Sequence, residues 1–167
     1  MIVGSFITSE KETYGIFSDG YAQSVTDEFI FEYNSLRDVL EKDSLSLMYE
    51  NALGTSKLKH SKIKFLPPLI NPTKIICVGM NYRKPYPIDG PKVSDPNNII
   101  LFGKNREAML AHLDFLESPV GDASNSFDYE GEIAVVIGKQ ARNISPANAH
   151  EYIFGFSAFN DGSVRDW

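Results

Sequence analysis

The sequence contains little cysteine and has a deficit of positive charge. Its single cysteine, Cys77, cannot form an internal disulfide, which is typical of a protein from a reducing compartment such as the cytoplasm. The 16 Lys and Arg residues are outnumbered by 22 Asp and Glu residues, which gives a net charge of −6, and the basic residues are scattered. Neither nucleic acid nor an anionic membrane is therefore expected as a partner.

Long apolar runs and targeting signals are absent as well. No run approaches the ~20 residues needed to span a bilayer. The N-terminus lacks the basic region, apolar core and cleavage site of a secretory signal. The sequence contains neither G-x-G-x-x-G nor G-x-x-x-x-G-K-[ST], so no motif supports dinucleotide or P-loop nucleotide binding. We expect a cytoplasmic protein without membrane spans.

The length and composition are those of a globular protein. The chain has 167 residues, of which 43% are hydrophobic and 12% aromatic. Folding a chain of this size buries about 70% of the surface that the unfolded chain exposes, so neither disulfides nor a metal is needed to hold it together. Any metal site would therefore indicate function.

The first fifty residues predict a small α+β unit. Residues 1–25 contain three short β-prone runs with a turn at 18–20, which is the signature of a β-meander. Amphipathic helices are predicted to begin at Ser35 and at Ser44. Gly54 stands where a helix-terminating glycine belongs.

Prolines 67, 68 and 72 mark the expected boundary between two domains. We place a small N-terminal α/β domain at residues 1–68 and a β-rich, mixed-sheet domain at 69–167, for an overall α+β class. Residues 83–98 hold four prolines and predict a loop. Strand patterns resume at 98–102 and 129–137. A short helix is predicted to open at Ser145-Pro146 and to end near Gly155.

The E-G-E sequence at residues 130–132 is the sharpest chemical signal. Residues two apart on a strand share one face, so Glu130 and Glu132 head a stripe that continues with Ala134 and Val136. If this stripe is buried, the two carboxylates need protons, Lys or Arg partners, or a divalent cation to neutralise them. A hard cation would need a further oxygen donor from elsewhere in the chain. The alternative is a solvated strand edge.

A second cluster, at residues 160–166, follows the apolar run 152–159. Asp161 would stand at the end of a buried strand, although Asn-Asp-Gly is also strong turn chemistry. A third candidate is the end of the apolar strand at 75–79, which runs into the polar residues Asn81 and Arg83.

Taken together, these segments resemble the catalytic domain of the fumarylacetoacetate hydrolase family. The resemblance rests on ICVGMNYR at 76–83, LFGK at 101–104, the segment with E-G-E at 128–145 and GFSAFNDGSVRDW at 155–167. It covers about residues 65–167, and residues 1–58 are similar to the small N-terminal domain of many bacterial members.

The resemblance implies a metal-dependent enzyme. In the family, a divalent cation, usually Mg²⁺ or Mn²⁺, is held by residues that correspond to Glu130, Glu132 and Asp161; Ca²⁺ is a further candidate. The implied substrates are 2-oxo acids and acylpyruvate-like diketones, with the metal acting as a Lewis acid on an enolate. Arg83 and Lys104 are candidate cations for a substrate carboxylate. The resemblance also implies a homodimer.

The sequence departs from the family pattern in two places. The His and Glu that activate water in hydrolytic members are replaced by Pro85 and Ile88, neither of which accepts a proton. Dehydration, decarboxylation or tautomerisation would tolerate this loss better than hydrolysis, and no catalytic residue is assigned.

The sequence also stops before the strands and lysine loop with which the family domain normally continues. We therefore expect an incomplete catalytic domain with uncovered apolar strands such as 133–137. The alternative function is a non-catalytic homologue that keeps the fold as a metal-binding or structural module.

Overall fold

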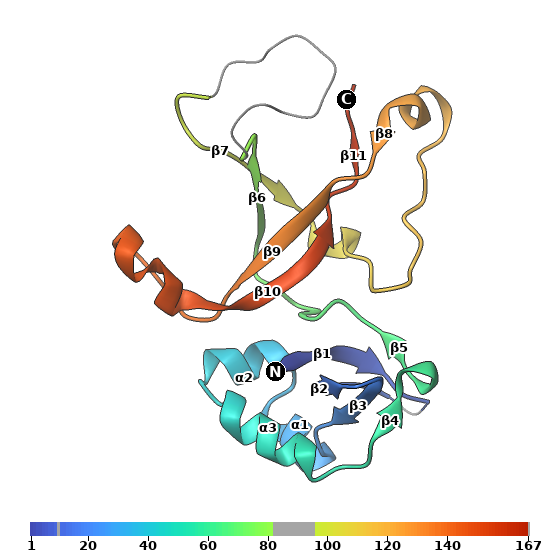
Figure 1. The fold of residues 1–167 in the computed structure, drawn as a ribbon, viewed down its shortest axis with the longest axis vertical. Helices are drawn as coiled ribbons and strands as arrows, with labels where there is room; N and C mark the ends of the chain where they lie inside the picture. The colour runs from blue at the N-terminus through green and yellow to red at the C-terminus, as the bar shows by residue number, and fades with distance from the viewer. Residues whose placement is uncertain (10, 82–95, 167) are drawn as a thin grey trace.

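The N-terminal part of the chain forms a five-stranded antiparallel sheet flanked by three short helices (Figure 1). The computed structural model describes residues 1–9, 11–81 and 96–166. The sheet has the order β4-β3-β2-β1-β5 and confirms the expected meander. Its elements are β1 (Ile2–Ile7), β2 (Glu12–Ser18), β3 (Tyr21–Ser24), α1 (Asp27–Glu32), α2 (Leu36–Glu41), α3 (Leu45–Leu53), β4 (Leu58–Lys59), the 3₁₀ turn η1 (His60–Lys62) and β5 (Lys64–Phe65).

The core of this unit lies between the sheet and the helices. Tyr14 and Ile16 of β2, together with Val25 after β3, pack against apolar residues of the helices. Nine buried residues form one cluster: Tyr14, Ile16, Val25, Phe29, Tyr33, Leu36, Val39, Met48 and Ala52.

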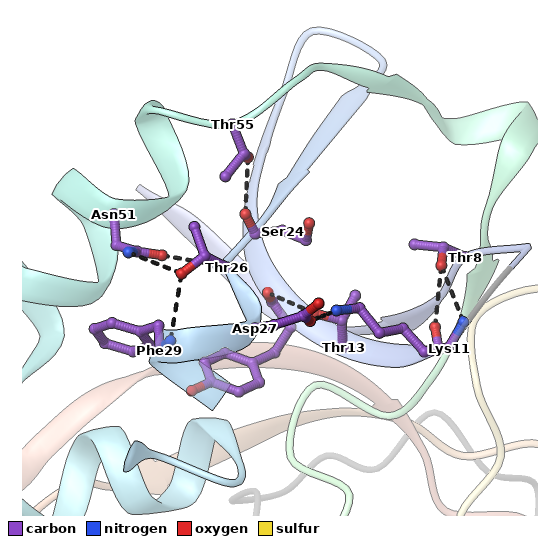
Figure 2. A network of polar contacts seen from close by, with 10 residues as sticks. Thr8, Lys11, Thr13, Ser24, Thr26, Asp27, Phe29, Asn51 and Thr55 are labelled. Carbon is purple, nitrogen blue, oxygen red and sulfur yellow. Dashed lines mark hydrogen bonds and ion pairs between the residues drawn. The ribbon is translucent and has the colours of Figure 1, made fainter. Parts of the chain in front are cut away.

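The starts of α1 and α2 are fixed by side-chain caps, whereas Ser44 makes no capping hydrogen bond at α3. Ser35 and Ser44 precede α2 and α3 as the sequence predicts, and Ser35 Oγ accepts a hydrogen bond from the Asp38 amide. Helix α1 is not anticipated by the sequence. It begins after Thr26, whose hydroxyl accepts from the Phe29 amide and from Asn51 of α3, as Figure 2 shows.

Two further contacts in Figure 2 hold the meander to the helices. The Lys11 ammonium forms an ion pair with Asp27 in the first turn of α1, and the Thr55 hydroxyl donates to the Ser24 carbonyl at 2.8 Å. Gly54 ends α3 as expected, but with φ −73° it does not use the left-handed conformation that favours glycine.

Gln23 joins the sheet to the end of α3. Its buried amide Nε2 lies 3.2, 3.2 and 2.9 Å from the carbonyl oxygens of Ala52, Leu53 and Thr55 at the C-terminal end of α3. The Ala52 carbonyl also accepts from the Thr55 amide and hydroxyl. We expect Gln23→Leu to lower the free energy of unfolding by about 1–3 kcal/mol, because the carbonyls of Leu53 and Thr55 lose this donor. Urea unfolding measures the loss. Gln140→Leu, on the exposed surface, is the control, and equal midpoints for the two variants would contradict the role.

The remainder of the chain is built from antiparallel strand pairs. Figure 1 shows a long curved ribbon of β9 and β10, with the β6–β7 pair and the short β8–β11 pair around it. The elements are β6 (Ile75–Gly79), β7 (Ile100–Lys104), η2 (Arg106–Ala108), η3 (Gly121–Ser126), β8 (Phe127–Asp128), β9 (Gly131–Ile137), η4 (Pro146–Tyr152), β10 (Ile153–Asn160) and β11 (Ser163–Val164).

Three details correct the sequence prediction. Strand β9 begins at Gly131, so Glu130 precedes it. The helix opened by Ser145 is 3₁₀ in type and ends at Tyr152, and Gly155 belongs to β10. The mixed α+β class is as predicted. The expected boundary between residues 68 and 69 stays a prediction.

The two faces of β9 differ as the alternating pattern predicts. Glu132, Ala134 and Val136 are half-buried on one face. The other face is open to solvent, where Ile133 is 67% exposed and Phe156 from β10 is 68% exposed. Within the described ranges, no helix is long and apolar enough to cross a bilayer.

Candidate functional site

The pairing of β9 with β10 brings the two acidic motifs together. Gly131 lies opposite Asn160 in the antiparallel register, so Asp161 emerges beside Glu130. The Asp161 amide donates to the Glu130 carbonyl at 2.8 Å, and the Glu130 amide donates to Asn160 Oδ1 at 3.2 Å. Residues thirty positions apart thus share one end of the ribbon.

Asp161 is buried against the β6–β7 pair. Its side chain is 2% exposed, and its Oδ1 forms an ion pair with the Lys104 ammonium at the end of β7. Lys104 also donates to the Gly162 carbonyl at 3.2 Å. Strands β6 and β7 place Cys77 and Lys104 on the same face, because Cys77 is opposite Phe102, two residues before Lys104.

Burial and the neighbouring carboxylates change the pKa values of Glu132 and Cys77. Burial raises the pKa of Glu132, and the negative charges of Asp161 and Glu130 raise it further. Burial, followed by the Asp161 carboxylate, raises the pKa of the Cys77 thiol to about 11. Cys77 is therefore protonated near neutral pH, in agreement with the prediction that it is a buried core residue and not a nucleophile.

Arg165 supplies the second cation of the site. Its guanidinium donates two hydrogen bonds to Asp128 Oδ2, at 3.0 and 2.8 Å, and lies 3.3 Å from Glu130 Oε2. These bonds lower the pKa of Asp128. The sequence leaves protons, Lys or Arg partners, or a divalent cation as ways to neutralise the carboxylates. The structure pairs Asp161 with Lys104 and Glu130 with Arg165. Arg165 was missed as a site residue, although the N-D-G-S-V-R-D motif contains it.

The donor chemistry fits a hard divalent cation. Glu130, Glu132 and Asp161 offer only carboxylate oxygens, which Mg²⁺ and Mn²⁺ prefer, and the pairing of β9 with β10 brings Glu130 and Asp161 to the same end of the ribbon. In the described part of the chain, however, no three His, Cys, Asp or Glu side chains are already grouped to hold an ion. Lys104 and Arg165 face these carboxylates instead.

The remaining predicted positions lie elsewhere. Arg83, the second candidate for a substrate carboxylate, is outside the described residues, as are Pro85 and Ile88. Lys104 is the one predicted substrate-binding residue that the structure places in the acidic cluster.

Comparison with known proteins identifies the family. The family model "Fumarylacetoacetate (FAA) hydrolase C-terminal" matches residues 74–167, which is more than half of the chain. The chain belongs to the fumarylacetoacetate hydrolase family. The match contains the described acidic cluster, from Cys77 to Arg165.

Curated relatives of the family cover most of the chain. A fumarylacetoacetate hydrolase domain-containing protein 2 homolog of Dictyostelium discoideum is 38% identical over 117 residues, 70% of this chain and 37% of its own length. The oxaloacetate tautomerase YisK of Bacillus subtilis is 32% identical over 141 residues, 84% of this chain and 44% of its own length. The chain thus spans less than half the length of these relatives.

Solved structures share the fold. A fumarylacetoacetate hydrolase from psychrophilic Exiguobacterium antarcticum superposes with a TM-score of 0.71 at 26% identity, over 98% of this chain and 56% of that one. The family and the α+β fold are therefore as predicted.

Proposed function

We propose that this chain contributes the metal-binding part of an enzyme that interconverts the keto and enol forms of a 2-oxo acid. The observation that carries the proposal is the approach of Asp161 to Glu130 at the end of the β9–β10 ribbon, with Glu132 two residues along the chain from Glu130 and the Lys104 ammonium paired with Asp161. The relatives named oxaloacetate tautomerase, from Bacillus subtilis and Xenopus laevis among others, support the reaction class.

In this proposal, Glu130, Glu132 and Asp161 would hold Mg²⁺ or Mn²⁺. When bound, the cation would polarise the oxygens of a 2-oxo acid as a Lewis acid. Lys104 contributes a positive charge that is only 27% exposed, where it attracts a substrate carboxylate more strongly than it would in water. Arg165 fixes the orientation of Glu130.

Tautomerisation also suits the residues at positions 85 and 88. The reaction moves one proton between carbon and oxygen and needs no activated water. Pro85 and Ile88, which cannot act as bases, would disable activation of water by the family's His–Glu pair, a loss that tautomerisation tolerates better than hydrolysis does.

The test is the rate at which the ultraviolet absorbance of enol oxaloacetate decays, with and without Mn²⁺. We expect metal-dependent acceleration over buffer, and a loss of about 100-fold or more in kcat for Lys104→Met, because a preorganised charge is removed. Lys139→Met, on the exposed surface, should retain full activity. A wild-type rate equal to that of buffer under both conditions would overturn the proposal.

The second candidate is a non-catalytic metal-binding homologue, favoured by Pro85 and Ile88. It predicts stoichiometric Mn²⁺ binding without acceleration of oxaloacetate, acylpyruvate or 2-oxo-3-deoxy sugar acid conversion. Turnover of any of these would exclude it.

A further inference from the structure

One segment connects the N-terminal sheet with the acidic cluster. Residues 109–116 follow β7 and η2, and in Figure 1 this part of the chain passes beside β5. It contains a tight turn at Ala111–Asp114, in which the Asp114 amide donates to the Ala111 carbonyl and the Ala111 amide donates back to Asp114 Oδ2, both at 3.2 Å.

The backbone of this turn is strained. Leu113 has φ +72°, a conformation that a bulky residue adopts rarely and that persists only where the surroundings impose it. The surroundings here are the paired hydrogen bonds of the turn and its contacts with the N-terminal sheet. The segment is thus held in one shape.

Two side chains dock the turn on β5. The His112 ring packs edge-to-face with Phe65 at a centroid distance of 5.0 Å, and Phe65 in turn contacts Phe17 and His60 of the N-terminal unit. Asp114 Oδ1 lies 4.0 Å from the Lys64 ammonium. His112 and Asp114 of the turn therefore contact two adjacent residues of β5, Phe65 and Lys64.

At its other end the segment packs on the site. The Leu116 side chain covers Gly162 so closely that a Cβ on Gly162 would overlap Leu116 Cδ2 and would lie 3.5 Å from Phe127 Cε2. The Gly162 carbonyl is the oxygen to which Lys104 donates. Leu116 thus packs on the peptide that helps to hold Lys104 against Asp161.

We propose that Leu116 is a positioning residue, and that the 109–116 segment uses the N-terminal sheet as an anchor to hold the Asp161–Gly162 turn in register with Lys104. Only the catalytic consequence of this role rests on the proposed function. The mechanical consequence concerns the order of the turn and needs neither metal nor substrate.

Hydrogen exchange of the Asp161 amide, which donates to Glu130, reports that order directly. In the full chain without metal, we expect Leu116→Ala to speed exchange at Asp161 by about tenfold or more, because Gly162 loses its cover. Leu110→Ala is the matched control, since Leu110 lies on the same segment and is 47% exposed against 43% for Leu116. Equal exchange in the two variants would overturn the proposal.

A double variant distinguishes positioning from simple loss of packing. Gly162→Ala alone should also speed exchange, because its methyl group displaces Leu116. Gly162→Ala with Leu116→Ala should return exchange toward wild type, since the new methyl group enters the space that Leu116 leaves. Additive effects of the two substitutions would contradict the proposal.

The anchor is tested at His112, which contacts Phe65 and lies on the same segment as Leu116. His112→Ala should speed Asp161 exchange, and His112→Phe, which keeps a ring on Phe65, should restore it. If His112→Ala leaves the exchange rate of the Asp161 amide unchanged, the N-terminal sheet does not anchor the segment.

Turnover separates this inference from the proposed function. If the chain accelerates oxaloacetate tautomerisation, Leu116→Ala should lower kcat with little change in KM, because Lys104 is misplaced and not removed; a change in KM alone would count against positioning. If no turnover is found, the proposed function fails while the exchange results still decide the role of Leu116.

Discussion

Gly15→Val will prevent the N-terminal sheet from folding. Gly15 lies in the middle of β2, opposite Gly4 of β1 and Ser24 of β3. A Cβ at this position would overlap the Gln23 carbonyl oxygen and lie 2.9 Å from the Gln23 carbonyl carbon and 3.0 Å from Ser24 Cα. These are backbone atoms of a paired strand, so they cannot move without breaking the β2–β3 pairing.

The expected cost is large even for the smaller Gly15→Ala, about 4 kcal/mol or more in the free energy of unfolding, which is the range of severe backbone and packing conflicts. Urea unfolding followed by circular dichroism measures it. Gly54→Ala is the control, because Gly54 has a helical φ and its nearest contact to an added Cβ would be 3.4 Å, so we expect a change within about 0.5 kcal/mol. A Gly15→Ala variant as stable as Gly54→Ala would show that β3 can shift freely.

The parts of the fold that the sequence predicts are those set by local periodicity. Alternation over residues 132–137 gives the correct faces of β9, and the serines at 35 and 44 give the helix starts, because a cap and a strand pleat need only near neighbours in the chain. Gly54 shows the limit of the same reasoning, since a terminating glycine predicts a helix end without requiring a left-handed backbone.

The geometry of the site depends both on spacing within the sequence and on the pairing of distant strands. The E-G-E spacing places two carboxylates near one another, but the approach of Asp161 depends on the register of β9 with β10. The ion pair between Lys104 and Asp161 depends further on how the β6–β7 pair packs on that ribbon, which no spacing in the sequence specifies. The resemblance to the family gave Asp161 as a metal ligand and Lys104 as a cation for a substrate carboxylate, but it did not give their ion pair.

The exposed apolar residues of β9 also follow from the alternation of its sequence. Ile133 and Ile137, 67% and 60% exposed, alternate with half-buried residues on β9, and Leu101 of β7 is 60% exposed. A strand with apolar side chains on both of its faces is expected to be covered on both faces. The described residues cover one of them, the face that carries Glu132. The expected homodimer remains a prediction.

The largest effect on the proposed metal site is expected from the two glutamates. Glu130→Ala with Glu132→Ala should abolish stoichiometric Mn²⁺ binding in calorimetry, because two of three proposed ligands are lost. Glu151→Ala, an exposed glutamate outside the cluster, should leave binding unchanged. Unchanged binding in the double variant would refute the ligand assignment.

Lys104→Met should act in the opposite direction on the same measurement. The ammonium of Lys104 is paired with Asp161, so it competes with a cation for that carboxylate. Removing it leaves a 2% exposed carboxylate without its positive partner, and we expect Mn²⁺ to bind about tenfold more tightly or better. The same variant is expected to lose turnover. Tighter Mn²⁺ binding combined with lost turnover would show that Lys104 acts on the substrate while Asp161 acts on the metal. Weaker Mn²⁺ binding would instead contradict this assignment and show that Lys104 supports the metal site.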